Sequence, residues 1–384
     1  MKEKLLRFGS YVLVAVLATV ATLTAVHLEI GLKPSKLDQL EELIAERFIE
    51  DTDPEALVDA AANAMVKATG DRWSYYIPAS EYASYREQAE NAYVGVGMTI
   101  QKTEDDSGFL IIEVASGGPA EEAGIQLMDL LIAVENTDVR TMEMEEIRDL
   151  VKGKEGTSVS LTVLRQGIHE TVTVQRRKVQ TPVATYEMLA GKIGLVTIVN
   201  FDERCAEESI EAIEKLLDNG AEKLIFDVRY NPGGYANELV ELLDYLLPEG
   251  DLFRTVRYDG KEHVDKSDKD CLEIPMAVLV NASSYSAAEF FAAALREYDA
   301  AVVVGEQTVG KGYFQTTYQL SDGSAVALSI GKYFTPKGVS LAETGVTPDV
   351  EVPVEDSVAA EIYYGTLTPD EDPQIQAAVK ALNK

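Results

Sequence analysis

The chain has 384 residues, enough for two or three domains with their own hydrophobic cores. Its formal net charge of −31 argues against nucleic acid and anionic lipid as partners, because both need clustered lysine and arginine. The two cysteines, Cys205 and Cys271, lack metal-site spacing, and the sequence leaves open whether they form a disulfide. The three histidines form no HExxH motif and stand near no nucleophile motif, which argues against a zinc peptidase and against a Ser-His-Asp triad.

The N-terminal segment, residues 1–33, predicts a membrane anchor. Basic residues precede a run from Phe8 to Leu28 that carries no formal charge, and about twenty apolar residues span a hydrocarbon core. The basic residues before the run and Glu29 after it place the N-terminus in the cytoplasm. We therefore expect a single-pass protein of the cell membrane with the rest of the chain on the extracytoplasmic side; a cleaved signal peptide is the alternative.

An N-terminal helical region is predicted over residues 34–92. Leu37 to Phe48 and Pro54 to Thr69 carry apolar residues at helical spacing. Their apolar faces suit packing against another helix or against a second copy of the chain. A homodimer through these helices is therefore one expectation.

Short strands and turns replace the helical pattern in residues 93–178. The predicted strands are Phe109 to Val114, Leu130 to Val134, Ser158 to Arg165 and Glu170 to Arg177, with a helix from Thr141 to Val151. The segment GPAEEAG at 118–124, followed by DLLIAV at 129–134, resembles a PDZ domain. This resemblance implies that a peptide C-terminus adds as a strand to the domain.

The peptide-binding residues of this predicted PDZ domain follow from the same resemblance. Backbone N–H groups of the loop at Gly95 and Gly97 would receive the carboxylate, although a plain hairpin loop is the alternative. Specificity would come from the apolar side chains of the groove. These are Val96, Met98, Ile147 and Val151.

An α/β core is predicted after Val183. Lys192 to Asn200 and Leu224 to Val228 are predicted strands, with an amphipathic helix from Glu207 to Leu217 between them. The second strand leads into DVRYNPGG at 227–234. Adjacent glycines at a strand end allow backbone N–H groups to approach a ligand closely, and an ordinary strand-to-helix turn is the alternative.

Two further buried strands, Met276 to Val280 and Ala300 to Val304, are predicted to be parallel and joined by a right-handed helical crossover. The segments after them, 281–286 and 305–311, would then lie at one carboxyl edge of the sheet, where α/β proteins keep their chemistry. The sequence therefore predicts a site at this edge.

Ser286 and Lys311 are the reactive pair that this edge predicts, a serine nucleophile and a lysine base. The lysine must be neutral, which requires its pKa to fall by roughly 3 through burial. Gln315 lies on the same face and could hold the amine, and the N–H of Ala287 at the helix N-terminus could stabilise an oxyanion. Ser286 acting only as an N-cap to Glu289 is the alternative.

A phosphate loop is a further alternative for GEQTVGKG at 305–312, which fits a Walker A motif in all but its last place. Gly312 stands where serine or threonine would hold magnesium, and YFQTTYQL after it predicts a strand rather than a helix. Nucleotide binding is therefore not expected.

The stretches VNASSYSAAE at 280–289 and GEQTVGKGYFQ at 305–315 resemble the carboxy-terminal processing proteases, tail-specific serine peptidases with a Ser-Lys dyad. GDRWSYY at 70–76, DVRYNPGG at 227–234, YFTPKG at 333–338 and GVTPD at 345–349 fit the same family in the same order. The resemblance implies a crotonase-like α/β protease core over residues 179–384, ending in a C-terminal helix. An inserted PDZ domain and an N-terminal helical region after a transmembrane helix complete the expected α/β multidomain fold.

The resemblance also assigns residues. It places the nucleophile at Ser286, the base at Lys311, the orienting glutamine at Gln315 and the second oxyanion donor at Gly233, with Gly234 as the neighbour that could hold that role instead. Departures from the family pattern stand at five positions. Tyr285 replaces a small residue, Ala288 a serine and Val309 a phenylalanine. Arg72 replaces a proline, and Lys152 replaces an arginine linked to activation by bound peptide.

The predicted function is that of a membrane-anchored extracytoplasmic serine endopeptidase, which recognises substrate C-termini through its PDZ domain and needs no cofactor or metal. Its expected partners are protein or peptide substrates with a free C-terminus and the membrane, not nucleic acid. A non-catalytic PDZ scaffold on a protease-like fold is the alternative.

Overall fold

A computed structural model of the chain describes Val16, Ala18, Thr19, residues 34–103 and residues 105–383. They belong to two compact units, one ending at Gly70 and the other beginning at Asp71. Among these residues, no helix is long and apolar enough to cross a membrane. Apart from Val16, Ala18 and Thr19, the predicted anchor at 8–28 lies outside the described residues, so it stays a prediction.

The N-terminal unit contains the two predicted helices, α2 (Lys36–Arg47) and α3 (Pro54–Lys67). Each begins at a side chain that accepts a hydrogen bond from a backbone N–H of the first turn: Ser35 Oγ from Asp38, and Asp53 Oδ1 from Glu55. Neither helix buries a residue within its own unit. Their apolar side chains are therefore left on the surface of that unit.

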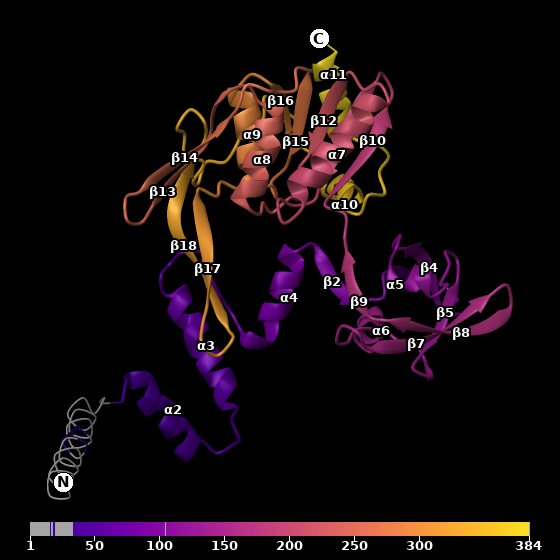
Figure 1. Ribbon diagram of the computed structural model, residues 1–384, viewed down its shortest axis with the longest axis vertical. Coiled ribbons are helices and arrows are strands. Elements are labelled where there is room, and N and C mark those ends of the chain that lie inside the picture. Colours follow the sequence, from indigo (N-terminus) through magenta and orange to yellow (C-terminus); the bar gives the residue numbers. More distant parts are fainter. Residues whose placement is uncertain (1–15, 17, 20–33, 104, 384) are drawn as a thin grey trace, which may run out of the picture. The chain divides into compact units, whose positions relative to one another are not determined.

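The central sheet of the second unit runs in the order β10-β11-β12-β15-β16-β19 (Figure 1). Its strands are β10 (Ala184–Leu189), β11 (Ile193–Ile198), β12 (Lys223–Asp227), β15 (Met276–Val280), β16 (Ala301–Gly305) and β19 (Val350–Glu351). β10 is antiparallel to β11, and the other pairs are parallel. Every residue of β15 is buried, as expected for an uninterrupted apolar strand covered on both faces.

Helices cover both faces of this sheet (Figure 1). α7 (Cys205–Asp218), α8 (Ala236–Leu246) and α9 (Ala287–Glu297) share one core cluster with Val278 and Val280. α11 (Pro373–Leu382) packs on the other face, in a cluster that contains Ala277 and Leu279. Successive side chains of β15 therefore point to opposite faces of the sheet, and the fold has three layers: helices, sheet and helices. A further helix, α10 (Asp356–Tyr363), precedes α11 in the chain.

A second, antiparallel sheet is formed by β1 (Tyr75–Ile77), β18 (Ala325–Phe334), β13 (Gly250–Arg257) and β14 (Glu262–Ser267), with β17 (Tyr313–Gln319) also paired to β18. β17 is a predicted strand. The β13-β14 hairpin and α4 (Ala79–Ala89) are not predicted. The sequence of α4 lacks the apolar stripe that marks a packed helix, and in the structure α4 buries no residue.

The region after α4 forms a small β domain with its own core. Two strands, β2 (Ala92–Gly95) and β9 (Arg177–Gln180), pair where the chain enters and leaves it. The other elements are β3 (Met98–Lys102), β4 (Phe109–Val114), α5 (Pro119–Glu122), β5 (Leu130–Val134), β6 (Thr137–Asp138), α6 (Met144–Val151), β7 (Ser158–Arg165) and β8 (Ile168–Gln175). The strand predicted from Glu170 to Arg177 is present as β8, but it begins at Ile168 and ends at Gln175. Arg177 belongs to β9, because the chain leaves β8 at the buried Arg176 to pair with β2.

Candidate active site

Ser286 lies in a strained turn between β15 and α9. Its backbone has φ +60° and ψ −124°, a conformation that costs a residue with a side chain about 1–3 kcal/mol. The neighbouring loop holds the turn in place: Ser284 Oγ donates to the carbonyl of Val228 (2.7 Å), and the N–H of Tyr285 donates to the carbonyl of Asn231 (3.1 Å). The loops after β12 and β15 therefore fix the serine together.

Glu289 connects the Ser286 turn to the lysine loop. Its buried carboxylate accepts hydrogen bonds from the N–H groups of Ser286 (3.0 Å), Gly310 (2.7 Å) and Lys311 (2.9 Å), and from the hydroxyl of Thr308. The relation of Ser286 to Glu289 is that of a capping box. Because the same carboxylate reaches the lysine loop, the capping alternative and the catalytic interpretation are compatible. Strand β17 after this loop argues against a Walker A motif, whose lysine opens a helix.

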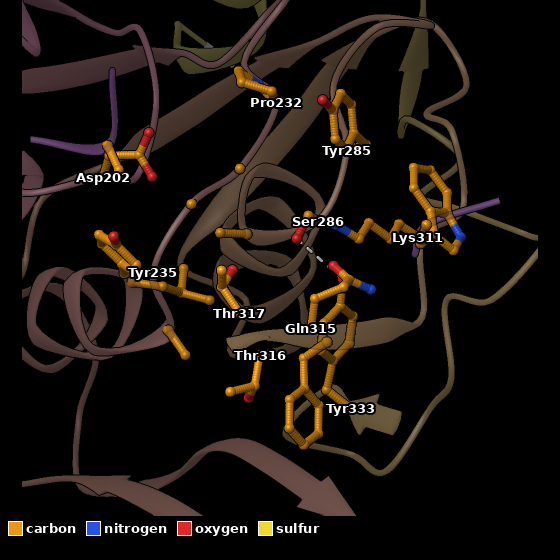
Figure 2. A pocket seen from close by; sticks show the side chains of 18 of the residues that line it. Asp202, Pro232, Tyr235, Tyr285, Ser286, Lys311, Gln315, Thr316, Thr317 and Tyr333 are labelled. Carbon is orange, nitrogen blue, oxygen red and sulfur yellow. Dashed lines mark hydrogen bonds between the residues drawn. The ribbon is translucent and has the colours of Figure 1, made fainter. Parts of the chain in front are cut away.

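The Lys311 side chain extends toward Ser286 (Figure 2). Its Nζ lies 5.0 Å from the ring centroid of Trp73 and 5.7 Å from that of Tyr285. Burial lowers the pKa of Lys311 from 10.5 to about 8, although the charges of Asp71 and Glu289 act in the opposite direction. A lysine with this pKa is neutral in about a tenth of molecules at pH 7.

Gln315 lines the same cavity, but its amide contacts differ from the prediction. Its Nε2 donates to the carbonyl of Tyr313 (3.1 Å) and to Ser329 Oγ (2.9 Å). The N–H of Ser329 donates to Ser74 Oγ (3.0 Å), and Ser74 in turn donates to the Asp71 carboxylate (2.6 Å). These bonds connect Gln315 to the 71–74 segment rather than to the Lys311 amine.

Gly233 and Ala287 lie together beside the serine. A Cβ atom on Gly233 would come within 2.6 Å of the Ser286 Cβ and 2.8 Å of the Ala287 nitrogen, and the φ of Gly233 is +88°. The N–H of Gly233 donates to Asn231 Oδ1 (2.8 Å). Gly233 and Ala287 therefore lie side by side, with the Gly233 N–H already bonded to Asn231 and Gly234 next in the chain; their role as oxyanion donors stays a prediction.

A cavity of about 980 Å³ contains the predicted catalytic and oxyanion residues. It also contains Tyr333, which the sequence does not single out. The Tyr333 hydroxyl donates to Ser286 Oγ at 3.2 Å (Figure 2), and burial raises the pKa of Tyr333. The YFTPKG motif marks this position, but only the pairing of β18 brings its tyrosine to the serine.

Trp73 and Tyr285 form an aromatic wall of the cavity. Their rings stack with centroids 5.8 Å apart, and the Arg72 guanidinium lies 4.3 Å from the Trp73 centroid. Two departures from the family pattern, Arg72 and Tyr285, therefore both lie against one tryptophan ring.

The predicted peptide-binding residues fall around the core of the β domain. Val96 and Ile147 are buried in that core, whereas Met98 and Val151 are partly buried against it. Gly95 ends β2, and Gly97 has φ +75° in the turn before β3. β3 stands at the end of its sheet order, so one edge is open to strand addition within the described sheet.

Lys152 is exposed at the C-terminal end of α6. Arg176, and not Lys152, binds the carbonyls at that helix end: its guanidinium donates to the carbonyls of Val151 (2.6 Å) and Leu150 (3.3 Å). Cys205 and Cys271 are both free thiols.

The fold and the site together define a serine-type peptidase that carries a PDZ domain. Two family models match the chain: Peptidase family S41 over residues 192–352 and the PDZ domain over residues 110–165. The second match lies inside the predicted PDZ boundaries of 93–178.

Named relatives identify the family. The chain is 33% identical to the carboxy-terminal processing protease CtpA of Bacillus subtilis, over 93% of this chain and 79% of that protein. It is 31% identical to a CtpA-like serine protease of Staphylococcus saprophyticus, over 88% of this chain and 70% of that protein. The chain therefore belongs to peptidase family S41, the carboxy-terminal processing proteases. An S41 protease structure from Bacteroides fragilis, 19% identical, has the same fold, with a TM-score of 0.54 over 90% of this chain and 97% of that one.

Proposed function

We propose that the chain is a membrane-anchored endopeptidase that cleaves protein substrates near their C-termini, with Ser286 as nucleophile and Lys311 as base. The observation that carries this proposal is the buried amine of Lys311, directed at Ser286 and with its pKa lowered to about 8. A lysine that loses its proton near neutral pH can act as a general base.

In the proposed first step, neutral Lys311 Nζ takes the proton of Ser286 Oγ as Oγ bonds to the scissile carbonyl carbon. The hydrogen bond from Tyr333 occupies a lone pair of Oγ and leaves the serine proton free for the amine. The oxyanion accepts hydrogen bonds from the N–H groups of Ala287 and of Gly233, or of Gly234 beside it.

In the second step, the Lys311 ammonium returns its proton to the leaving amine, and the C-N bond breaks. The neutral lysine then takes a proton from a water molecule that attacks the acyl-enzyme, and that proton passes to Ser286 Oγ as the ester bond breaks. Gln315 is the proposed orienting residue, acting through Ser329 on the 71–74 segment that covers the amine.

The PDZ domain binds the substrate C-terminus in this proposal. The backbone at Gly95 and Gly97 receives the carboxylate, and the peptide adds to the open edge of β3. Met98 and Val151 contact its side chains, with Val96 and Ile147 forming the base of the groove. Lys152, exposed at the end of α6, is the candidate switch that senses bound peptide.

The segment 8–28 is the proposed single-pass anchor, with the catalytic part on the extracytoplasmic side. Carbonate extraction and protease protection of the full chain in membrane vesicles test this placement. The exposed side chains of α2 and α3, including Leu40, Leu43 and Met65, are the proposed contact with a second copy.

Cleavage of casein by the wild-type chain tests the proposed chemistry. Ser286→Ala and Lys311→Ala should each abolish cleavage and serine labelling by a fluorophosphonate, with unchanged circular dichroism. Ser283→Ala is the matched control, because Ser283 is an exposed serine of the same turn, and it should retain activity. If Lys311→Ala retains most activity, the dyad assignment is wrong; if the wild-type chain neither cleaves casein nor is labelled, the non-catalytic scaffold is favoured.

A further inference from the structure

Asp202 lines the active-site cavity on the side of Ser286 away from Lys311 (Figure 2). Its position is fixed by backbone hydrogen bonds to the glycine loop: the N–H of Phe201 donates to the Gly233 carbonyl (2.8 Å), and the N–H of Tyr235 donates to the Phe201 carbonyl (2.7 Å). Gly233 in turn abuts the Ser286 Cβ. Hydrogen bonds therefore hold the backbone next to Asp202 against the loop that packs on the nucleophile, and the Asp202 side chain lines the same cavity.

The surroundings of Asp202 are aromatic. The rings that line this cavity with it include Tyr75, Tyr85, Tyr235 and Tyr285. Aromatic faces and a carboxylate together suit an organic cation, which gains both a Coulombic and a cation–π contact.

The carboxylate lacks a positive partner within the part of the chain that the structure describes. Burial raises the pKa of Asp202 to about 7, and the negative charges of Glu203 and Glu238 add to this effect. Arg86, a cation that lines the same cavity, is paired with Glu90 (2.9 Å). A desolvated carboxylate surrounded by like charges is costly, and either a proton or a cation from outside the chain relieves that cost.

We propose that Asp202 and its aromatic neighbours form a substrate subsite for a lysine or arginine side chain, close to the scissile bond. This inference rests on the proposed function and names part of the substrate sequence. An extended peptide advances about 3.3 Å per residue, so the short connection from Ser286 through Gly233 to Asp202 places the cationic residue within about three positions of the cleaved bond. The net charge of −31 favours approach of a basic segment.

Matched peptides test the subsite. Each peptide carries lysine, norleucine or glutamate at one of the three positions on either side of the cleaved bond, and all end in the same C-terminal sequence so that PDZ binding is constant. For wild type, kcat/KM should favour lysine over norleucine by about tenfold at one position and should disfavour glutamate. Asp202→Asn should bring the lysine-to-norleucine ratio to about one.

Glu207→Gln is the control, because it removes the same charge from an exposed residue of α7 that does not line the cavity, and it should keep the wild-type ratio. The proposal is overturned if wild type shows no lysine preference at any position, or if Asp202→Asn leaves the preference intact. Dissociation constants of the same peptides with Ser286→Ala protein separate this outcome from failure of the proposed function. A lysine preference in binding without cleavage by wild type would refute the catalytic proposal and retain the subsite.

Discussion

Replacing Lys311 with methionine should stabilise the folded chain while abolishing its activity. Burial holds the lysine pKa at about 8, against an ordinary value of 10.5. This difference of about 2.5 corresponds to about 3 kcal/mol, since each pKa unit is worth about 1.36 kcal/mol. At pH 7 the folded state carries this cost of a buried ammonium, and methionine removes it with little change in volume.

The pH dependence of this stabilisation gives the sharper measurement. Below pH 8 both states bind the lysine proton; between pH 8 and 10.5 the folded state releases it while the unfolded state keeps it. Stability of the wild type therefore rises with pH in this window. From pH 7 to 9.5 it should gain about 2 kcal/mol relative to Lys311→Met, so the variant's advantage falls from about 3 to about 1 kcal/mol.

Urea unfolding followed by tryptophan fluorescence measures this difference near the site, because Trp73 is the single tryptophan of the chain and lies 5.0 Å from the Lys311 amine. Lys332→Met is the control, since Lys332 is an exposed lysine on β18, and it should show no such pH-dependent difference. A Lys311→Met variant that is less stable than wild type at pH 7, with a gap independent of pH, would refute the buried-amine argument.

Gly233→Ala should lower kcat at least about a hundredfold, because its Cβ would contact the serine and the oxyanion donor. Gly260 has a similar positive φ but open space around it, so Gly260→Ala should leave kcat unchanged. Equal losses of kcat in the two variants would refute the reasoning. Tyr333→Phe should reduce kcat about fivefold to tenfold with little effect on KM, and an unchanged kcat would show that its hydrogen bond is dispensable. Glu289→Gln should destabilise the fold by about 3 kcal/mol, since the amide cannot accept all four hydrogen bonds. Its residual activity should reach half-maximum below pH 8, because removing the anion lowers the Lys311 pKa further; a midpoint above 8 contradicts this.

The sequence could predict the convergence of Ser286 and Lys311 because it follows from local pattern and one topological rule. β15 is a continuous apolar run found at the predicted residues, and β16 differs from its prediction by one residue at each end. Parallel pairing then brings the segments after both strands to one edge. Buried strands and crossover handedness are thus enough to place these two loops.

The antiparallel part of the site could not be predicted in the same way. Tyr75 pairs with Ala327, so the 71–76 segment contacts residues that are more than 250 positions away in the sequence. Phe314 pairs with Gly331 in the same sheet. Local patterns do not specify such a register, because each strand shows only its own alternation. Gln315 illustrates the consequence: its place on the correct face is predictable, but its hydrogen bond to Ser329 depends on how β17 pairs with β18.

The aromatic wall acts on Lys311 in two opposing directions. A cation above the faces of Trp73 and Tyr285 is stabilised, which favours the ammonium, and the Asp71 charge favours it too. The same rings exclude water, which favours the neutral amine. Because the pKa nevertheless falls to about 8, desolvation outweighs both attractions. Aromatic residues at positions 73 and 285 are therefore compatible with a basic lysine.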